Sequence, residues 1–261
     1  MSNILTELAE EARARVARAK EAVPLEEMMR KADSKPLTGL PFEAALRKDG
    51  MSFICEVKRA SPSKGVISDD FPYLDIAKEY EAAGASCISV LTEPSRFLGD
   101  IRYLSEISDA VDVPVLRKDF VVDEYMIYEA KAAGASAVLL ICSILDEGTL
   151  GRFLRLCDTL GMSALVEAHD RDEIRRALIC GARVIGINNR DLRDFSVNPR
   201  NCLRLRPYVP DDVLFVAESG ISSRRDVEDL EENGVDAVLI GEALMRSPDR
   251  KAMLHDLGCG E

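Results

Sequence analysis

Short apolar, strand-like runs alternate with amphipathic helical stretches from about residue 51 to residue 248, and this alternation constrains the fold most. A strand followed by a returning helix, repeated many times, predicts parallel strands. We count eight such runs. They are predicted at residues 53–57, 87–91, 113–117, 137–141, 164–167, 184–188, 214–217 and 237–240.

Four junctions between a helix and the next strand carry a glycine flanked mostly by small residues: Gly84, Gly134, Gly181 and Gly234, spaced by 50, 47 and 53 residues. A glycine suits the left-handed residue that ends a helix. Eight nearly continuous apolar strands fit a closed parallel barrel, because an open sheet would leave two edges. The prediction is an α/β fold of the (β/α)8 TIM-barrel class, with an open doubly wound sheet as the alternative.

Helix starts are marked by side chains that can cap free N–H groups. Asp123, Asp146 and Asp170 each stand just ahead of a helical run, and Ser223 and Asp226 have capping-box spacing. Before the barrel, apolar residues recur every three or four positions from residue 4 to residue 23, which predicts a helix. We therefore expect one domain over residues 1–261, with an N-terminal helical extension at 1–50 and the barrel at 51–248.

The composition of the 261-residue chain excludes several classes of function. A formal net charge of -12 disfavours nucleic acid or an anionic membrane as partner. Seven cysteines without a C-x-x-C pair, together with only two histidines, make a zinc site and a histidine-centred triad poor hypotheses. No apolar run approaches the ~20 residues of a membrane span. We expect a soluble, cytoplasmic protein.

The residues that close the predicted strands are unusually polar, and the active site of such a barrel lies at the carboxyl ends of its strands. Glu56 and Lys58 are two positions apart, so they share the face that points into the mouth, whereas Cys55 and Val57 take the other face. Lysines and acids that converge there can shift one another's protonation for acid/base chemistry. Each residue alone could equally be a solvated strand end or part of a structural ion pair.

A cationic mouth that binds an anionic ligand is a second expectation. Within an acidic chain, basic residues gather at the predicted strand ends: Lys58, Arg59, Lys64, Arg117, Lys118 and Arg190. After the last two strands, Ser219–Gly220 and Gly241–Glu242 place small residues ahead of helix starts, an arrangement that binds phosphate.

Five segments in chain order resemble the indole-3-glycerol phosphate synthase family. They are EVKRASPSKG at 56–65, LRKDF at 116–120, LVE at 165–167, GINNRDL at 186–192 and AESGI at 217–221. The likeness extends from about Phe42 to Met245. It implies conversion of 1-(2-carboxyphenylamino)-1-deoxyribulose 5-phosphate to indole-3-glycerol phosphate with loss of carbon dioxide and water. The family uses no metal or organic cofactor, so the resemblance implies none here.

The resemblance also implies roles for residues of this chain. Lys118 would be the general acid that protonates the substrate carbonyl, and Lys58 would engage the benzoate carboxylate. Glu167 and Glu56 would complete the proton relay. The remaining site residues are implied to orient the hydroxyls (Asn188), to hold charge at the same edge (Arg190), to line the site (Ser61), to take the phosphate (Ser219, Gly220, Gly241 and Glu242) and to wall the aromatic ring (Phe97, Phe120, Leu139 and Leu192).

The N-terminal helix matches the extension that this family places over the barrel mouth, although the tryptophan of some members is absent, since the chain has none. By the same resemblance we expect a monomer. Three alternatives stay open: a Schiff-base lyase or aldolase in which Lys118 or Lys58 is the nucleophile, a non-catalytic phosphate-binding barrel, and a phosphoribosylanthranilate isomerase.

Overall fold

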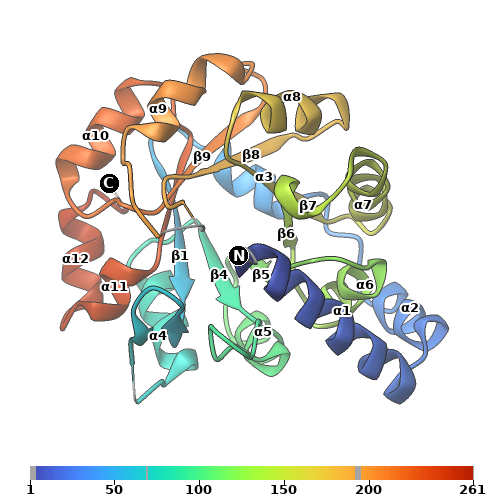
Figure 1. Cartoon of the computed structure of the whole chain (residues 1–261). Coiled ribbons are helices and arrows are strands. Elements are labelled where there is room, and N and C mark those ends of the chain that lie inside the picture. The colour runs from blue at the N-terminus through green and yellow to red at the C-terminus, as the bar shows by residue number, and fades with distance from the viewer. Residues whose placement is uncertain (1–3, 69, 192–194, 261) are drawn as a thin grey trace.

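The computed structural model describes residues 4–68, 70–191 and 195–260, and its eight long strands form a closed, all-parallel barrel (Figure 1). Around the barrel the order is β1, β10, β9, β8, β7, β6, β5, β4, so the last strand pairs with the first. The barrel prediction is confirmed. The strands are β1 (Ser52–Val57), β4 (Cys87–Leu91), β5 (Val115–Lys118), β6 (Ala137–Ile141), β7 (Ser163–Ala168), β8 (Val184–Asn188), β9 (Leu214–Glu218) and β10 (Ala237–Ile240).

Helices follow the strands and cover the outside of the barrel (Figure 1). They are α4 (Tyr73–Ala82), α5 (Ile101–Ser108), α6 (Glu124–Ala132), α7 (Glu147–Thr159), α8 (Arg171–Ile179), α9 (Asn201–Leu205), α10 (Arg224–Glu232), α11 (Glu242–Arg246) and α12 (Arg250–Asp256), with 3-10 turns η1 (Cys142–Ile144) and η2 (Arg206–Tyr208). The predicted caps are present: the Asp146 side chain accepts a hydrogen bond from the Thr149 backbone, and Ser223 with Asp226 forms a capping box. Gly84 and Gly134 end their helices at φ of 93° and 92°, as expected.

Three helices precede the barrel: α1 (Ile4–Ala22), α2 (Leu25–Asp33) and α3 (Pro41–Leu46). Figure 1 shows that α1 starts in front of the barrel and runs outward past α6 to α2. Leu5 and Leu8 of α1 belong to the same buried cluster as Phe120 and Ile141 at the strand ends. Helix α1 therefore lies over the mouth, as the resemblance implied for the N-terminal helix.

At the opposite end of the barrel, α3 closes the interior. Phe42 and Leu46 are fully buried in the interior cluster, and Glu43 pairs with Arg183, just ahead of β8, at 3.0 Å. The apolar core thus has two layers, because alternate strand residues point inward and outward. Ile54 and Leu116 lie in the interior layer, whereas Cys55 lies in the layer between strands and helices.

Some strand boundaries differ from the prediction by one or two residues. β5 begins at Val115, two residues later than expected, because Pro114 has no backbone N–H to donate to a sheet. It ends one residue later than predicted, at Lys118, and β9 likewise ends at Glu218. A small hairpin of β2 (Ala60–Ser61) and β3 (Gly65–Val66) in the loop after β1 was not predicted.

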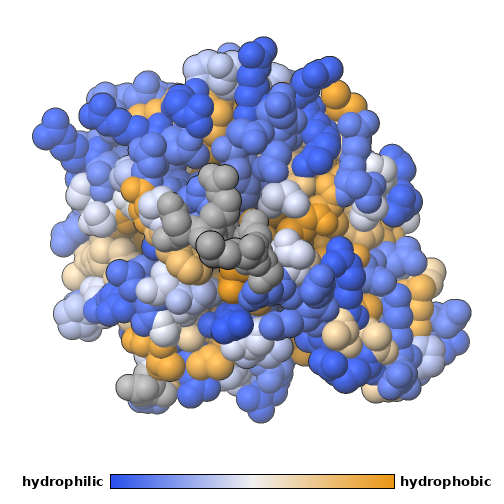
Figure 2. Space-filling model, in the orientation of Figure 1, coloured by the Kyte–Doolittle hydropathy of each residue, from blue (hydrophilic) through white to orange (hydrophobic). Residues whose placement is uncertain are grey.

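The surface around the mouth is mostly hydrophilic, with hydrophobic residues visible in a recess near the centre of the face that α1 crosses (Figure 2). Among the described residues, no helix has the length and apolar character needed to span a bilayer.

Candidate active site

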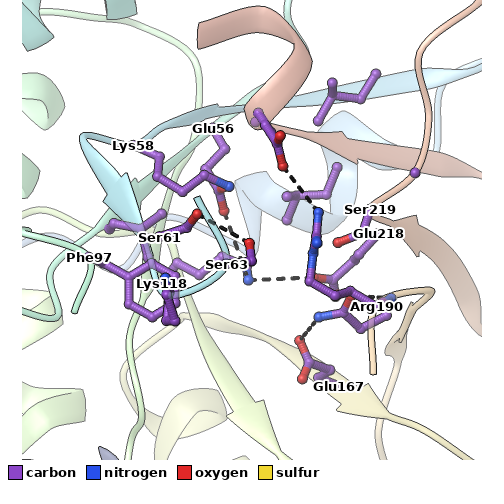
Figure 3. A pocket seen from close by; sticks show the side chains of 18 of the residues that line it. Glu56, Lys58, Ser61, Ser63, Phe97, Lys118, Glu167, Arg190, Glu218 and Ser219 are labelled. Atoms are coloured by element: carbon purple, nitrogen blue, oxygen red, sulfur yellow. Dashed lines mark hydrogen bonds and ion pairs between the residues drawn. The ribbon is translucent and has the colours of Figure 1, made fainter. Parts of the chain in front are cut away.

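The carboxyl ends of the strands surround a cavity of about 320 Å³, a size that suits a small molecule. Every one of the eight barrel strands, or the loop directly after it, contributes to its wall. All the predicted site residues that the structure describes line this one cavity; Leu192 lies outside the described residues. Figure 3 shows the polar side chains converging from different strands.

Lys118 occupies the centre of the charged group. Its Nζ lies 3.6 Å from Glu218 Oε2 and 3.9 Å from Glu56 Oε2 (Figure 3). Burial alone would lower the pKa of Lys118, but the charges of Glu218, Glu56 and Glu167 outweigh it and raise the pKa well above its ordinary value. The amine is therefore held as an ammonium at neutral pH.

Lys58 and Glu56 form a close pair on the face of β1 that points into the cavity. The Lys58 Nζ donates to Glu56 Oε1 at 2.5 Å. Burial opposes ionisation of the Glu56 carboxyl, yet the charges of Lys58 and Lys118 prevail and lower its pKa. Glu56 is thus an ionised carboxylate shared between two lysines. A Cβ at Gly241 would lie 2.3 Å from Glu56 Oε1, so a glycine must follow β10 for this carboxylate to fit.

Glu167, Asn188 and Arg190 form the opposite wall. The Asn188 Nδ2 donates to Glu167 Oε2 at 3.3 Å, and the Asn188 Oδ1 accepts from the Arg190 backbone N–H at 3.0 Å. The guanidinium of Arg190 donates to Glu242 Oε2 at 3.1 Å. Glu167 Oε1 is buried and makes no hydrogen bond among the described residues, although His169 Nε2 lies 3.4 Å from it.

A polar turn region and an apolar wall stand at different sides of the cavity. Ser219 and Gly220 follow β9 with φ of 67° and 78°, and Gly241 and Glu242 follow β10. The Phe97 and Phe120 rings stand 6.2 Å apart between centroids and line the cavity with Leu139. Ser61, beside Ser63 at 3.4 Å, reaches the cavity from the β2–β3 hairpin. The cavity thus offers separate places for a ring and for a polar anion.

Two expectations about charge are wrong. Arg117 does not face the mouth: it is buried in the outer layer, where it pairs with Asp119 at 3.2 Å and Glu129 at 2.8 Å, because Leu116 and Lys118 take the inward positions. Arg59 does not line the cavity either. Nor is the described part of the mouth cationic overall. Among the described residues, its lining has four basic residues, Lys58, Lys118, Arg190 and Arg246, and five acids, Glu56, Asp119, Glu167, Glu218 and Glu242.

Glu218 also lines the cavity, although it is not among the site residues predicted from the sequence. Both its carboxylate oxygens are buried and lack a hydrogen-bond partner among the described residues, and Lys118 is 3.6 Å away. Burial raises the pKa of Glu218 against the lowering effect of Lys118, and with the added charge of Glu167 it reaches about 7. Strand alternation was the available signal, because Leu214 and Val216 already point inward.

We expect Glu218→Gln to raise the melting temperature more at about pH 8 than at about pH 5.5. The pKa of Glu218 is about 7 in the folded protein, against an ordinary value of 4.5. Ionisation of Glu218 therefore lowers the free energy of unfolding by its full amount above about pH 7 and has no effect on it below pH 4.5. The change in the free energy of unfolding caused by Glu218→Gln should differ between these two pH values by on the order of 2 kcal/mol. Thermal unfolding at both pH values checks this, with Glu232→Gln on the exposed face of α10 as control. An equal change at both pH values would contradict it.

Comparisons with known proteins agree with this geometry. The family model described as indole-3-glycerol phosphate synthase matches residues 5–257. A protein of that name from Ruminiclostridium cellulolyticum is 54% identical over 216 residues, covering 83% of each chain. One from Lacticaseibacillus casei is 50% identical over 252 residues, covering 96% of this chain and 97% of its own.

Solved structures match in fold. A 3-hexulose-6-phosphate synthase superposes with a TM-score of 0.65 at 15% identity, over 79% of this chain and 98% of its own. A thiamine phosphate pyrophosphorylase from Pyrococcus furiosus does so with a TM-score of 0.59 at 16% identity, over 80% and 93%. At such low identity these likenesses bear on the fold alone.

Proposed function

Because this chain belongs to the indole-3-glycerol phosphate synthase family, we propose that the cavity at its barrel mouth closes the indole ring with Lys118 as general acid. The chain is a carboxy-lyase of tryptophan biosynthesis, and its substrate is a small molecule that contains phosphate. That substrate is 1-(2-carboxyphenylamino)-1-deoxyribulose 5-phosphate. The product, indole-3-glycerol phosphate, forms with loss of carbon dioxide and water.

The observation that supports this role is the placement of the Lys118 ammonium among Glu218, Glu56 and Glu167. A general acid must be protonated before the reaction and must reach the atom that gains charge. When the ring closes, the substrate's carbonyl oxygen becomes a hydroxyl, and Lys118 supplies the proton. The ring-closing carbon later loses this hydroxyl as water, so the same region must deliver a second proton.

Lys58 is proposed to hold the benzoate carboxylate until it leaves as carbon dioxide. Its pairing with Glu56 at 2.5 Å orients the ammonium toward the cavity, and the two can then exchange protons in the later steps. Glu167 is proposed to accept the proton that the forming indole releases; its Oε2 accepts from Asn188, and its Oε1 makes no hydrogen bond among the described residues. Glu218 is proposed to keep Lys118 charged.

The remaining parts of the cavity are proposed to bind the ends of the substrate. Phe97, Phe120 and Leu139 would pack on the anthranilate ring, since flat apolar faces suit an aromatic ring. The backbone at Ser219, Gly220, Gly241 and Glu242 would take the phosphate. Asn188 would orient the hydroxyls between them. The side chain of Glu242 is held away from an anion by Arg190, at 3.1 Å.

The Schiff-base alternative is disfavoured by the charge state of Lys118. An amine attacks a carbonyl only when it is neutral, and such lysines have a lowered pKa in an apolar or cationic setting. Here three carboxylates raise the pKa instead. The family membership disfavours a phosphate-binding barrel without catalysis.

The test is incubation of the purified, metal-stripped protein with the carboxyphenylamino-deoxyribulose phosphate, followed by indole absorbance. We expect indole-3-glycerol phosphate to form. Borohydride reduction in the presence of substrate should trap no adduct; a covalent adduct on Lys118 would favour the Schiff-base alternative. Binding of the substrate without indole product would overturn the proposal.

Three further expectations are part of the proposal. We infer a monomer that works in the cytoplasm and needs neither metal nor organic cofactor. Within residues 4–68, 70–191 and 195–260, no cluster of three or more His, Cys, Asp or Glu side chains has an arrangement that could hold a metal ion.

A further inference from the structure

His169 and Glu173 stand directly behind Glu167 and have no part in the function proposed above. His169 follows the end of β7, and Glu173 lies in the first turn of α8. The His169 Nδ1 is 3.2 Å from Glu173 Oε2, and the His169 backbone N–H donates to the same oxygen at 2.9 Å. Glu173 therefore fixes both the backbone and the ring of His169.

The other edge of the ring points at Glu167. The His169 Nε2 lies 3.4 Å from Glu167 Oε1, an ion-pair distance, and both atoms are buried and make no hydrogen bond in the described part of the chain. The second oxygen of Glu167 accepts from Asn188 at 3.3 Å. His169 next to one oxygen and Asn188 next to the other thus orient the Glu167 carboxylate.

The surroundings of the ring decide its charge. Acids face it from its own strand (Glu167), from α8 (Glu173) and from β9 (Glu218), while Asp170, Asp191 and Arg204 line the adjoining hollow. Burial by itself would lower the pKa of His169. The hydrogen bond to Glu173 and the charge of Glu167 outweigh it and raise the pKa to about 9. At neutral pH the ring is therefore an imidazolium, so both nitrogens carry a proton that they can donate.

We propose that His169 is a positioning residue: its imidazolium bridges Glu173 and Glu167 and holds the Glu167 carboxylate in one orientation toward the bound substrate. The inference rests on the proposed role of Glu167 in proton transfer. Once the ring is neutral, only one nitrogen carries a proton, and the bridge can no longer donate to both acids. Turnover should therefore fall above about pH 9 as the bridge is lost.

The charge of His169 and its interaction with Glu167 and Glu173 can be tested without measuring turnover. The chain has only two histidines, so proton NMR of the imidazole C2–H gives two titrating signals, and His169→Asn and His255→Asn assign them. We expect the His169 signal to titrate near pH 9 in the intact protein. Both Glu167→Gln and Glu173→Gln should move it toward the ordinary value of about 6.5, because each removes a negative neighbour.

A His169 midpoint near 6.5 in the intact protein, or one that Glu167→Gln leaves in place, would overturn the proposal. Because NMR needs no substrate, this result is independent of whether indole product forms. A failure of the proposed function would leave the titration as expected.

Kinetics test the positioning role itself. His169→Asn should lower kcat on the order of tenfold, the effect of one charge-assisted hydrogen bond, with KM changed less than about twofold. It should also remove the loss of activity above about pH 9. Glu173→Gln should lower kcat in the same way, and His255→Asn, on the exposed face of α12, should change nothing. Unchanged kcat and pH profile in a folded His169→Asn variant would refute the role.

Discussion

Replacing Lys118 with methionine is expected to lower kcat by roughly 10²- to 10⁴-fold, the range of a lost general acid. Methionine keeps the apolar stem that packs at the end of β5 and removes only the ammonium. Lys58, which also lines the cavity, is already paired with Glu56 at 2.5 Å, whereas Lys118 lies within 4 Å of both Glu218 and Glu56. The measurement is steady-state formation of indole product at saturating substrate.

The control for this experiment is Lys251→Met on α12, which removes an exposed lysine far from the cavity lining and should leave kcat unchanged. Thermal unfolding of both variants separates loss of chemistry from loss of fold. If folded Lys118→Met kept kcat within about tenfold of the parent, another group would have to supply the proton and the assignment would fall.

Asp119→Ala is expected to destabilise the protein by about 3–5 kcal/mol, the cost of removing one partner from a buried ion-pair network. Asp119 is fully buried and accepts from Arg15 at 2.6 Å, from Thr92 at 2.6 Å and from Arg117 at 3.2 Å. These charges lower the pKa of its carboxyl against the effect of burial. Its loss would leave Glu129 as the ion-pair partner of Arg117 and would remove the contact of Arg15 on α1 with the residue that follows β5.

Urea or thermal unfolding measures this change, which should lower the melting temperature on the order of 10 °C in a chain of this size. Glu27→Ala is the matched control, because Glu27 also forms an ion pair, with Lys31 at 3.1 Å, but both side chains are largely exposed. That pair should contribute less than about 1 kcal/mol. Similar losses in the two variants would show that burial of the Asp119 network adds no stability.

Most of the barrel could be predicted because its strands are buried on both faces and therefore appear as continuous apolar runs. Glycines at helix ends and carboxylates at helix starts supplied the boundaries between them. The hairpin at β2 and β3 could not be found this way, because two-residue strands have no period to detect.

Most residues of the site could be predicted from the sequence, whereas their charge interactions could be predicted less well. Positions such as Lys58 and Glu167 were identified because polar residues end apolar strands. A count of basic residues could not tell that Arg117 points outward into its own ion pairs, or that each lysine in the cavity has a carboxylate beside it. Those facts depend on which face of the strand a residue occupies, and for Glu218 on the burial that raises its pKa to about 7.

The close approach of Gly241 to Glu56 joins the first strand of the barrel to the last. On a ribosome, the segment that carries Glu56 emerges long before β10, so a nascent chain holds most of the reactive groups without a finished pocket. Substrate can then stabilise only chains in which β10 has docked. Ligand binding would thus report on completion of the ring of strands, and pulse proteolysis with and without substrate could follow that final docking step in refolding.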